Sequence, residues 1–178
     1  NEKRYGSAFL TKGFMDYEIA NLLKIISKGL KAHKDYNLLI KYAPGQELYQ
    51  CTQHSRFAKR YLDLKYTILD KKSKMVDHFP RSFCMITYDS TAALEAMSGN
   101  IPVIFLNAKT GYYKKLDKKN ELFFAETADD LDRFLNTLKN RISYDHYLSL
   151  QHRILKENFG LSRENLDGID PLTEFINR

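Results

Sequence analysis

The chain has 178 residues, a net charge of +6 and a hydrophobic fraction of 43%. This length suits a single domain, and the charge favours an anionic partner: a nucleotide phosphate, a nucleic acid or an anionic membrane face. No apolar run approaches the roughly 18 residues that cross a bilayer, and the first ten residues lack a signal-peptide core. Cys51, Cys84 and the scattered histidines predict neither a disulfide framework nor a metal site. We therefore expect a reduced, cytoplasmic protein.

Strands and helices alternate along the chain. In chain order we predict a strand at 6–13, a helix at 17–33, a strand at 36–44, a helix at 47–64, a strand at 65–70, a short helix at 73–80, a strand at 83–89, a helix at 90–99, a strand at 101–106, a Lys-rich loop, a strand at 121–126, and helices at 131–140 and 144–160. This alternation predicts an α/β fold with a Rossmann-like, doubly wound parallel sheet and helices on both faces. We expect one domain over 1–160, followed by a tail over 161–178 with a short helix.

The densest signal is "TYDSTAALEAMSGNIPVIFL", residues 87–106, where a strand passes into a helix. Ligands of doubly wound sheets bind at the carboxyl ends of strands, which is where Asp89, Ser90 and Thr91 lie. Backbone N–H groups at a helix start, together with these hydroxyls, can hold a phosphate or diphosphate. A simple Ser/Thr helix cap explains the same residues about equally well.

Glu95 follows Ser90 by five residues and Thr91 by four, so it returns to nearly the same helix face. A carboxylate there can accept both hydroxyls of a ribose whose phosphate rests at the helix start. The alternative is a surface or capping-box Glu.

Two segments resemble a known enzyme family. "LEAMSGNIPVI" looks like the ribose-binding helix and following strand of GT-B glycosyltransferases, and "YDSTAALEA" resembles the Ser/Thr-rich version in bacterial surface-polysaccharide and capsule transferases. "LLIKYAPG" is similar to the strand that carries a basic residue and a Pro in the same enzymes. The order of elements agrees over nearly the whole chain, although only the 87–106 block is specific.

The resemblance implies one half of a GT-B fold, the half that binds the nucleotide sugar. Ser90 and Thr91 would then contact the phosphates and Glu95 the ribose, with Asp89 as a further substrate-binding residue. Lys41 would face the phosphates or the donor, although a surface Lys at a strand end explains it equally well. The acceptor site would lie in a missing N-terminal domain, so this half would not be active alone, and no metal or other cofactor is implied.

Two departures from the family pattern limit the mechanism. Retaining GT-B enzymes often carry a second Glu eight positions before the ribose-binding one, and here that position is Thr87. Ala43 occupies the His position of the basic-x-His-Pro pattern. We name no catalytic residue, since His78 is a candidate by type only and is expected at a helix end before a strand.

The leading hypothesis is the donor-binding domain of a glycosyltransferase that builds a bacterial surface polysaccharide, with peripheral contact to an anionic inner membrane face. A second is a nucleotide-sugar epimerase or polyol-phosphate transferase on the same scaffold, against which Ala43 counts. A third is a non-enzymatic α/β module for nucleic acid or protein. Nucleic acid is not expected, because the Lys-rich runs lack interleaved aromatics apart from Tyr112 and Tyr113.

Overall fold

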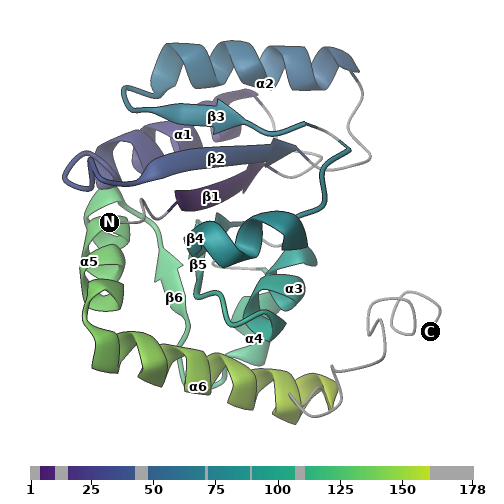
Figure 1. Cartoon of the computed structure of the whole chain (residues 1–178), viewed down its shortest axis with the longest axis vertical. Coiled ribbons are helices and arrows are strands. Elements are labelled where there is room, and N and C mark those ends of the chain that lie inside the picture. The colour runs from purple at the N-terminus through teal and green to yellow at the C-terminus, as the bar shows by residue number, and fades with distance from the viewer. Residues whose placement is uncertain are drawn as a thin grey trace.

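The computed structural model describes residues 5–10, 16–42, 48–70, 72–88, 90–106 and 111–160. Within these ranges, parallel strands form a six-stranded sheet in the order β3-β2-β1-β4-β5-β6 (Figure 1). The strands are β1 (Tyr5–Leu10), β2 (Asn37–Tyr42), β3 (Tyr66–Ile68), β4 (Ser82–Thr87), β5 (Val103–Leu106) and β6 (Phe123–Ala125). The strand order reverses direction between β1 and β4, which is the topological switch point of the sheet.

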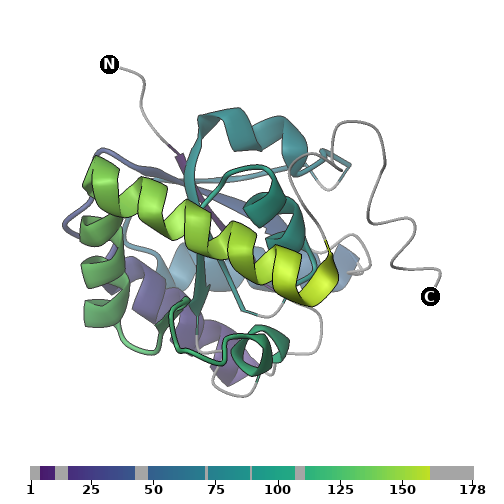
Figure 2. The same cartoon turned by 90° about the horizontal axis from the view of Figure 1, so that it is seen from below.

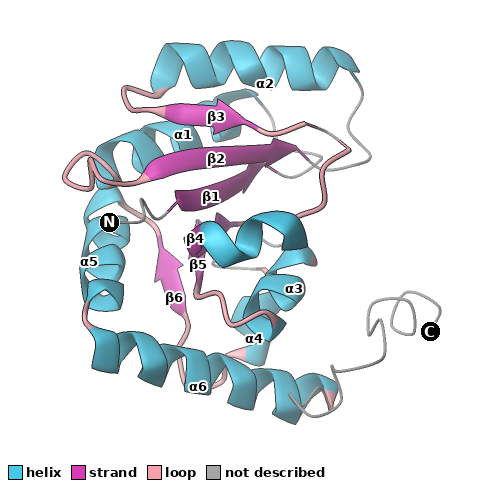
Figure 3. Ribbon diagram, in the orientation of Figure 1, coloured by secondary structure: helices cyan, strands magenta, loops and turns pink. Residues whose placement is uncertain are grey.

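Helices lie between successive strands, and two more follow the last strand (Figure 3). They are α1 (Asp16–Gly29), α2 (Leu48–Tyr61), the 3-10 helix η1 (Val76–Arg81), α3 (Ala92–Ser98), α4 (Tyr112–Leu116), α5 (Ala128–Lys139) and α6 (Arg141–Phe159). Successive residues of a strand point to opposite faces of the sheet. Phe124 of β6 and Phe105 of β5 stack on one face, where Phe105 also packs against Tyr113 of α4, whereas Phe123 stacks on Phe134 of α5. Helices therefore cover both faces, and the predicted α/β fold class is confirmed.

Capping side chains explain where the observed helices differ from the predicted ones. The Thr127 hydroxyl accepts the N–H of Asp130 at 3.1 Å, and the Asp130 carboxylate accepts the N–H of Thr127. This capping box starts α5 at Ala128, three residues earlier than expected. Asn140 accepts the N–H of Ser143 at 3.1 Å and starts α6 at Arg141 rather than at residue 144. The stretch that we expected to be a Lys-rich loop contains α4. The predicted tail, 161–178, lies outside the described residues.

Helix α6 lies nearest the viewer in Figure 2, and its side chains contact the amino ends of β5 and β6. The fully buried Gln151 accepts the N–H of Val103 at 2.7 Å and donates to the carbonyl of Ile101 at 3.2 Å. The hydroxyl of Tyr147 donates to the carbonyl of Val103 at 2.7 Å and accepts the N–H of Phe123 at 3.0 Å. Two side chains of α6 thus complete the backbone hydrogen bonding where two short strands begin.

Replacing Gln151 by methionine keeps the side-chain volume but leaves the Val103 N–H and the Ile101 carbonyl buried without partners. We expect Gln151→Met to lower the free energy of unfolding by about 2 kcal/mol in urea denaturation. The matched control is Lys156→Met on the exposed side of α6, which should change it by less than about 0.5 kcal/mol. Equal effects of the two substitutions would contradict the anchoring role of Gln151.

Cys84 lies in β4 and is 1% exposed. Burial raises the pKa of its thiol to about 12, so the reactive thiolate is scarce at pH 8. We expect Cys84 in the folded protein to resist iodoacetamide at pH 8 and to react once urea unfolds the chain. Peptide mass spectrometry measures Cys84 separately from Cys51. Native labelling of Cys84 at the rate of a free thiol would show that β4 is not a buried strand.

Candidate functional site

The register of the central strands places two polar side chains at the carboxyl edge of the switch point. Ala8 of β1 pairs with Ile40 of β2 on one side and with Ile86 of β4 on the other. The next residues, Lys41 and Thr87, therefore lie at the same level and on the same face of the sheet. One strand separates them, so their backbones are about 10 Å apart.

Lys41 and Thr87 are both buried, with 4% and 1% of their surfaces exposed. Because Lys41 is buried, it is not the exposed surface residue that the sequence left as an alternative. Such burial is rare for a lysine. The Thr87 hydroxyl is enclosed and has no hydrogen-bond partner in the part of the chain that the structure describes. Buried polar groups are normally hydrogen-bonded, and the carboxyl end of β4 thus carries an unsatisfied hydroxyl.

Ser90 and Thr91 form the turn between β4 and α3. The Ser90 hydroxyl accepts the N–H of Ala92 at 3.2 Å, and its carbonyl accepts the N–H of Ala93 at 3.0 Å. The Thr91 carbonyl accepts the N–H of Leu94 at 3.0 Å, while its exposed side chain makes no capping hydrogen bond. Ser90 therefore acts as a local cap, and Thr91 presents the hydroxyl that a ligand can reach.

Tyr113 fixes this turn from a distant part of the chain. Its hydroxyl donates to the Ser90 carbonyl at 2.9 Å, and its ring, 2% exposed, packs on Phe105 with centroids 4.6 Å apart. The sequence predicts a Lys-rich loop in this region and gives no indication of the contact between Tyr113 and Ser90. The available signal was an aromatic pair, Tyr112 and Tyr113, just before the lysines.

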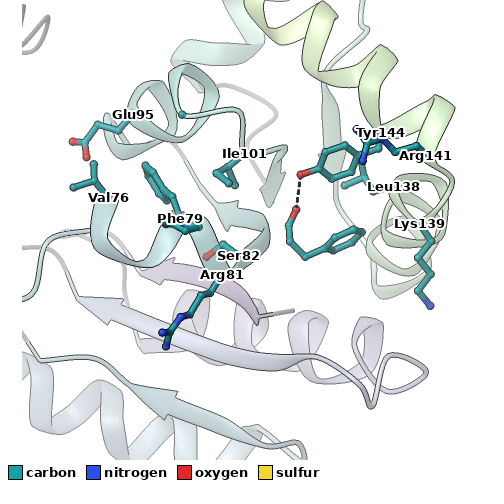
Figure 4. Close-up of a pocket in the computed structure, with 13 residues that line it drawn as sticks. Val76, Phe79, Arg81, Ser82, Glu95, Ile101, Leu138, Lys139, Arg141 and Tyr144 are labelled. Carbon is teal, nitrogen blue, oxygen red and sulfur yellow. Dashed lines mark hydrogen bonds between the residues drawn. The ribbon is translucent and has the colours of Figure 1, made fainter. Parts of the chain in front are cut away.

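Glu95 lies in the first turn of α3 and is half-buried among core residues of the same helix. Figure 4 shows its side chain beside Val76, at the start of η1. Ser90 and Thr91 thus lie in the turn after β4, Glu95 lies in the helix that follows, and Lys41 lies two strands away at the carboxyl edge of the sheet. Asp89 lies outside the described residues. The assignment of these residues to a ligand remains a prediction.

The described residues contain neither a cluster of metal ligands nor a membrane-spanning helix. No three His, Cys, Asp or Glu side chains come together there as metal ligands would. In the same ranges, every helix is too short or too polar to cross a membrane. His78 lies in the last turn of η1 before β4, as expected.

No family model and no curated protein sequence matches the chain. Solved structures do. The catalytic domain of cholesterol-alpha-glucosyltransferase from Helicobacter pylori matches with a TM-score of 0.58 and 14% identity over 89% of this chain and 99% of that one. S. aureus TarM, in a structure that contains UDP, matches with a TM-score of 0.62 and 11% identity over 99% of this chain and 35% of that one. A structure from Listeria monocytogenes, described as a UDP-N-acetylglucosamine 2-epimerase, matches with a TM-score of 0.60 and 12% identity over 92% and 47%.

The chain has the fold of one GT-B half. The GT-B resemblance read from residues 87–106 is confirmed at the level of fold, and identities of 11–14% establish nothing finer. The chain spans about a third of TarM but 99% of the glucosyltransferase catalytic-domain chain. In this GT-B half, the turn at Ser90 and Thr91 lies at the carboxyl edge next to the switch point.

The hydrogen bond from Tyr113 to Ser90 should stabilise the turn. We expect Tyr113→Phe to lower the free energy of unfolding by about 1 kcal/mol, because the Ser90 carbonyl loses its side-chain donor. Amide hydrogen exchange at 90–95 should become faster. Tyr112→Phe is the matched control, since that ring is 45% exposed and Tyr113 is retained. Unchanged exchange at 90–95 in Tyr113→Phe would show that α4 does not hold the turn.

Proposed function

We propose that this domain binds the nucleotide-sugar donor of a glycosyltransferase that builds a bacterial surface polysaccharide. The observation that carries the proposal is the placement of Ser90 and Thr91 in the turn after β4, next to the switch point of a GT-B half, with Glu95 in the helix α3 that follows. The polysaccharide class rests on the resemblance of "YDSTAALEA" to the Ser/Thr-rich segment of such enzymes. UDP, which the TarM structure contains, is the first nucleotide to test.

Each residue has a distinct role in this proposal. The exposed Thr91 hydroxyl donates to the diphosphate, while Ser90 holds the turn in shape. Glu95 accepts the two ribose hydroxyls. Lys41 contributes positive charge at the same edge of the sheet, which together with the helix dipole offsets the charge on the departing nucleoside diphosphate. Asp89 is proposed as a further contact on its place in the sequence alone.

The rest of the reaction belongs to a second domain in this proposal. The acceptor site and the general base lie there, since no described residue of this half is assigned to either role. The donor chemistry needs neither a metal nor another cofactor, because hydroxyls, a lysine and backbone dipoles supply the stabilisation. The net charge of +6 fits a cytoplasmic enzyme that works at an anionic membrane face.

The match to the Listeria structure favours one alternative, a nucleotide-sugar epimerase on the same scaffold. Both functions need the nucleotide site, so binding alone does not separate them. Incubation of the full-length protein with UDP-N-acetylglucosamine separates them by product. An epimerised nucleotide sugar supports the alternative, and transfer to an acceptor supports the transferase.

Isothermal titration calorimetry with UDP, CDP, GDP, ADP and CMP tests the donor site. We expect one nucleotide to bind selectively, and Glu95→Gln and Thr91→Val each to weaken it by about tenfold, which corresponds to the loss of a hydrogen bond to a charged group. Glu157→Gln, an exposed carboxylate on α6, is the control and should leave binding unchanged.

Two results would contradict the proposal. Selective binding that neither Glu95→Gln nor Thr91→Val weakens would place the nucleotide elsewhere. Failure of the folded full-length protein to bind any nucleotide or nucleotide sugar would remove the donor function altogether.

A further inference from the structure

Helices α1 and α2 pack against each other (Figure 1). The Nζ atom of Lys24 on α1 lies 5.1 Å from the ring centroid of Tyr61 on α2. Just after α2, the N–H of Asp63 donates to the hydroxyl of Ser27 on α1 at 2.9 Å. These contacts join the outer sides of the two helices into one surface.

The exposed side of this surface is strongly basic. Asp63 is the exposed carboxylate within residues 21–31 and 52–63, and the other charged side chains there are six exposed cations: Lys24, Lys28, Lys31, Arg56, Lys59 and Arg60. In the part of the chain that the structure describes, none of the six takes part in an ion pair. We call these six residues the basic face.

Helix stability does not explain the basic face. Lys24 and Lys28 lie four residues apart on α1, as do Arg56 and Arg60 on α2, and like charges at this spacing destabilise a helix. The helix dipole favours cations in the last turn, where Lys28 and Arg60 lie. Lys24 and Arg56 lie before that turn, so they gain little from the dipole.

The other long helices of the chain pair exposed arginines with acidic residues. Arg133 pairs with Asp130 on α5 at 2.8 Å, and Arg141 pairs with Asp145 on α6 at 2.7 Å. The excess positive charge on α1 and α2 is therefore a local feature of this surface. Such a surface is complementary to a partner that carries many negative charges.

We propose that the basic face binds the surface of an anionic membrane. Its cations come from successive turns of two helices, so they are spread over an area and do not surround a single phosphate. Clusters of about four to eight Lys and Arg residues on amphipathic helices bind anionic lipids. The inference rests on the proposed function, which includes an anionic membrane face, and it assigns the membrane contact to a defined surface.

The aromatic side chains of this surface favour lipid over single-stranded nucleic acid. Phe57 and Tyr61 are half-buried and stack on each other with centroids 6.0 Å apart. Lys24 and Arg60 lie over the Tyr61 ring, at 5.1 Å and 5.5 Å from its centroid. The Tyr61 ring is thus covered by protein groups, whereas nucleic-acid bases need exposed rings on which to stack.

The basic face leaves the proposed donor site uncovered. Helix α1 packs against α5, whose Phe134 stacks on Phe123 at one face of the sheet. The Ser90 turn is hydrogen-bonded to Tyr113 of α4, which covers the opposite face. A membrane held by α1 and α2 therefore does not cover the turn that we propose for donor binding.

Vesicle co-sedimentation of the full-length protein tests the inference. We expect binding to vesicles that contain phosphatidylglycerol, and no binding to vesicles of phosphatidylcholine alone. The bound protein should be released in about 1 M NaCl, where the screening length is about 3 Å. Equal binding to both kinds of vesicle, binding that survives this salt, or no binding to either vesicle would overturn the proposal.

A pair of substitutions locates the contact. Lys28→Gln combined with Lys59→Gln removes one exposed cation from each helix, and should weaken vesicle binding by about tenfold or more. The matched control is Lys115→Gln combined with Lys118→Gln, which removes the same charge in and just after α4 and should have a much smaller effect. An equal loss in the control pair would reduce the effect to net charge and overturn the assignment.

A single-stranded oligonucleotide is the competing partner to test under the same conditions. Saturable oligonucleotide binding that the Lys28→Gln, Lys59→Gln variant loses, without any vesicle binding, would assign the basic face to nucleic acid and overturn the membrane proposal.

Two further measurements separate this inference from the proposed function. Glu95→Gln should keep vesicle binding, and the Lys28→Gln, Lys59→Gln variant should keep the nucleotide affinity of the unmodified protein. Nucleotide binding without vesicle binding would overturn the membrane contact and leave the donor site intact. Vesicle binding without nucleotide binding would support the membrane contact and contradict the donor function alone.

Discussion

The pairing of β1 with both β2 and β4 is the constraint on which the candidate site depends. Because Ala8 is in register with Ile40 and Ile86, the ends of β2 and β4 are held at one level, and Lys41 and Thr87 share a face of the sheet. A shift of one residue in either pairing would turn one of these side chains to the other face. The positions of Ser90 and Thr91 follow from the same register, since they come directly after β4.

The hydroxyls of Ser90 and Thr91 have different surroundings in the structure, although the sequence alone does not distinguish them. The Ser90 hydroxyl accepts the N–H of Ala92, and the Ser90 carbonyl accepts the hydroxyl of Tyr113. Thr91 is exposed, and its side chain makes no capping hydrogen bond. The helix-cap and ligand interpretations of this turn are therefore compatible, because each applies to a different residue.

Local patterns in the sequence were sufficient to predict the alternation of strands and helices and the α/β class. The patterns failed where distant residues decide the structure. Helix α4 is short and Lys-rich, and it depends on the packing of Tyr113 against Phe105. The burial of Lys41 follows from its place in the sheet. The contact between Phe83 and Tyr144 could not be foreseen, because the two residues are 61 positions apart in the sequence.

The hydrogen bonds from Tyr147 and Gln151 of α6 to the starts of β5 and β6 have a consequence for the order of folding during synthesis. Val103 and Phe123 leave the ribosome well before Tyr147 and Gln151, which complete their hydrogen bonds. Until α6 has emerged, the amino ends of these two strands lack the side chains that satisfy them. The half of the sheet that carries the Ser90 turn should therefore mature late, whereas β1 and β2 can pair earlier around α1. A ribosome that stalls before residue 147 would leave the nascent chain with apolar strands exposed to chaperones and proteases.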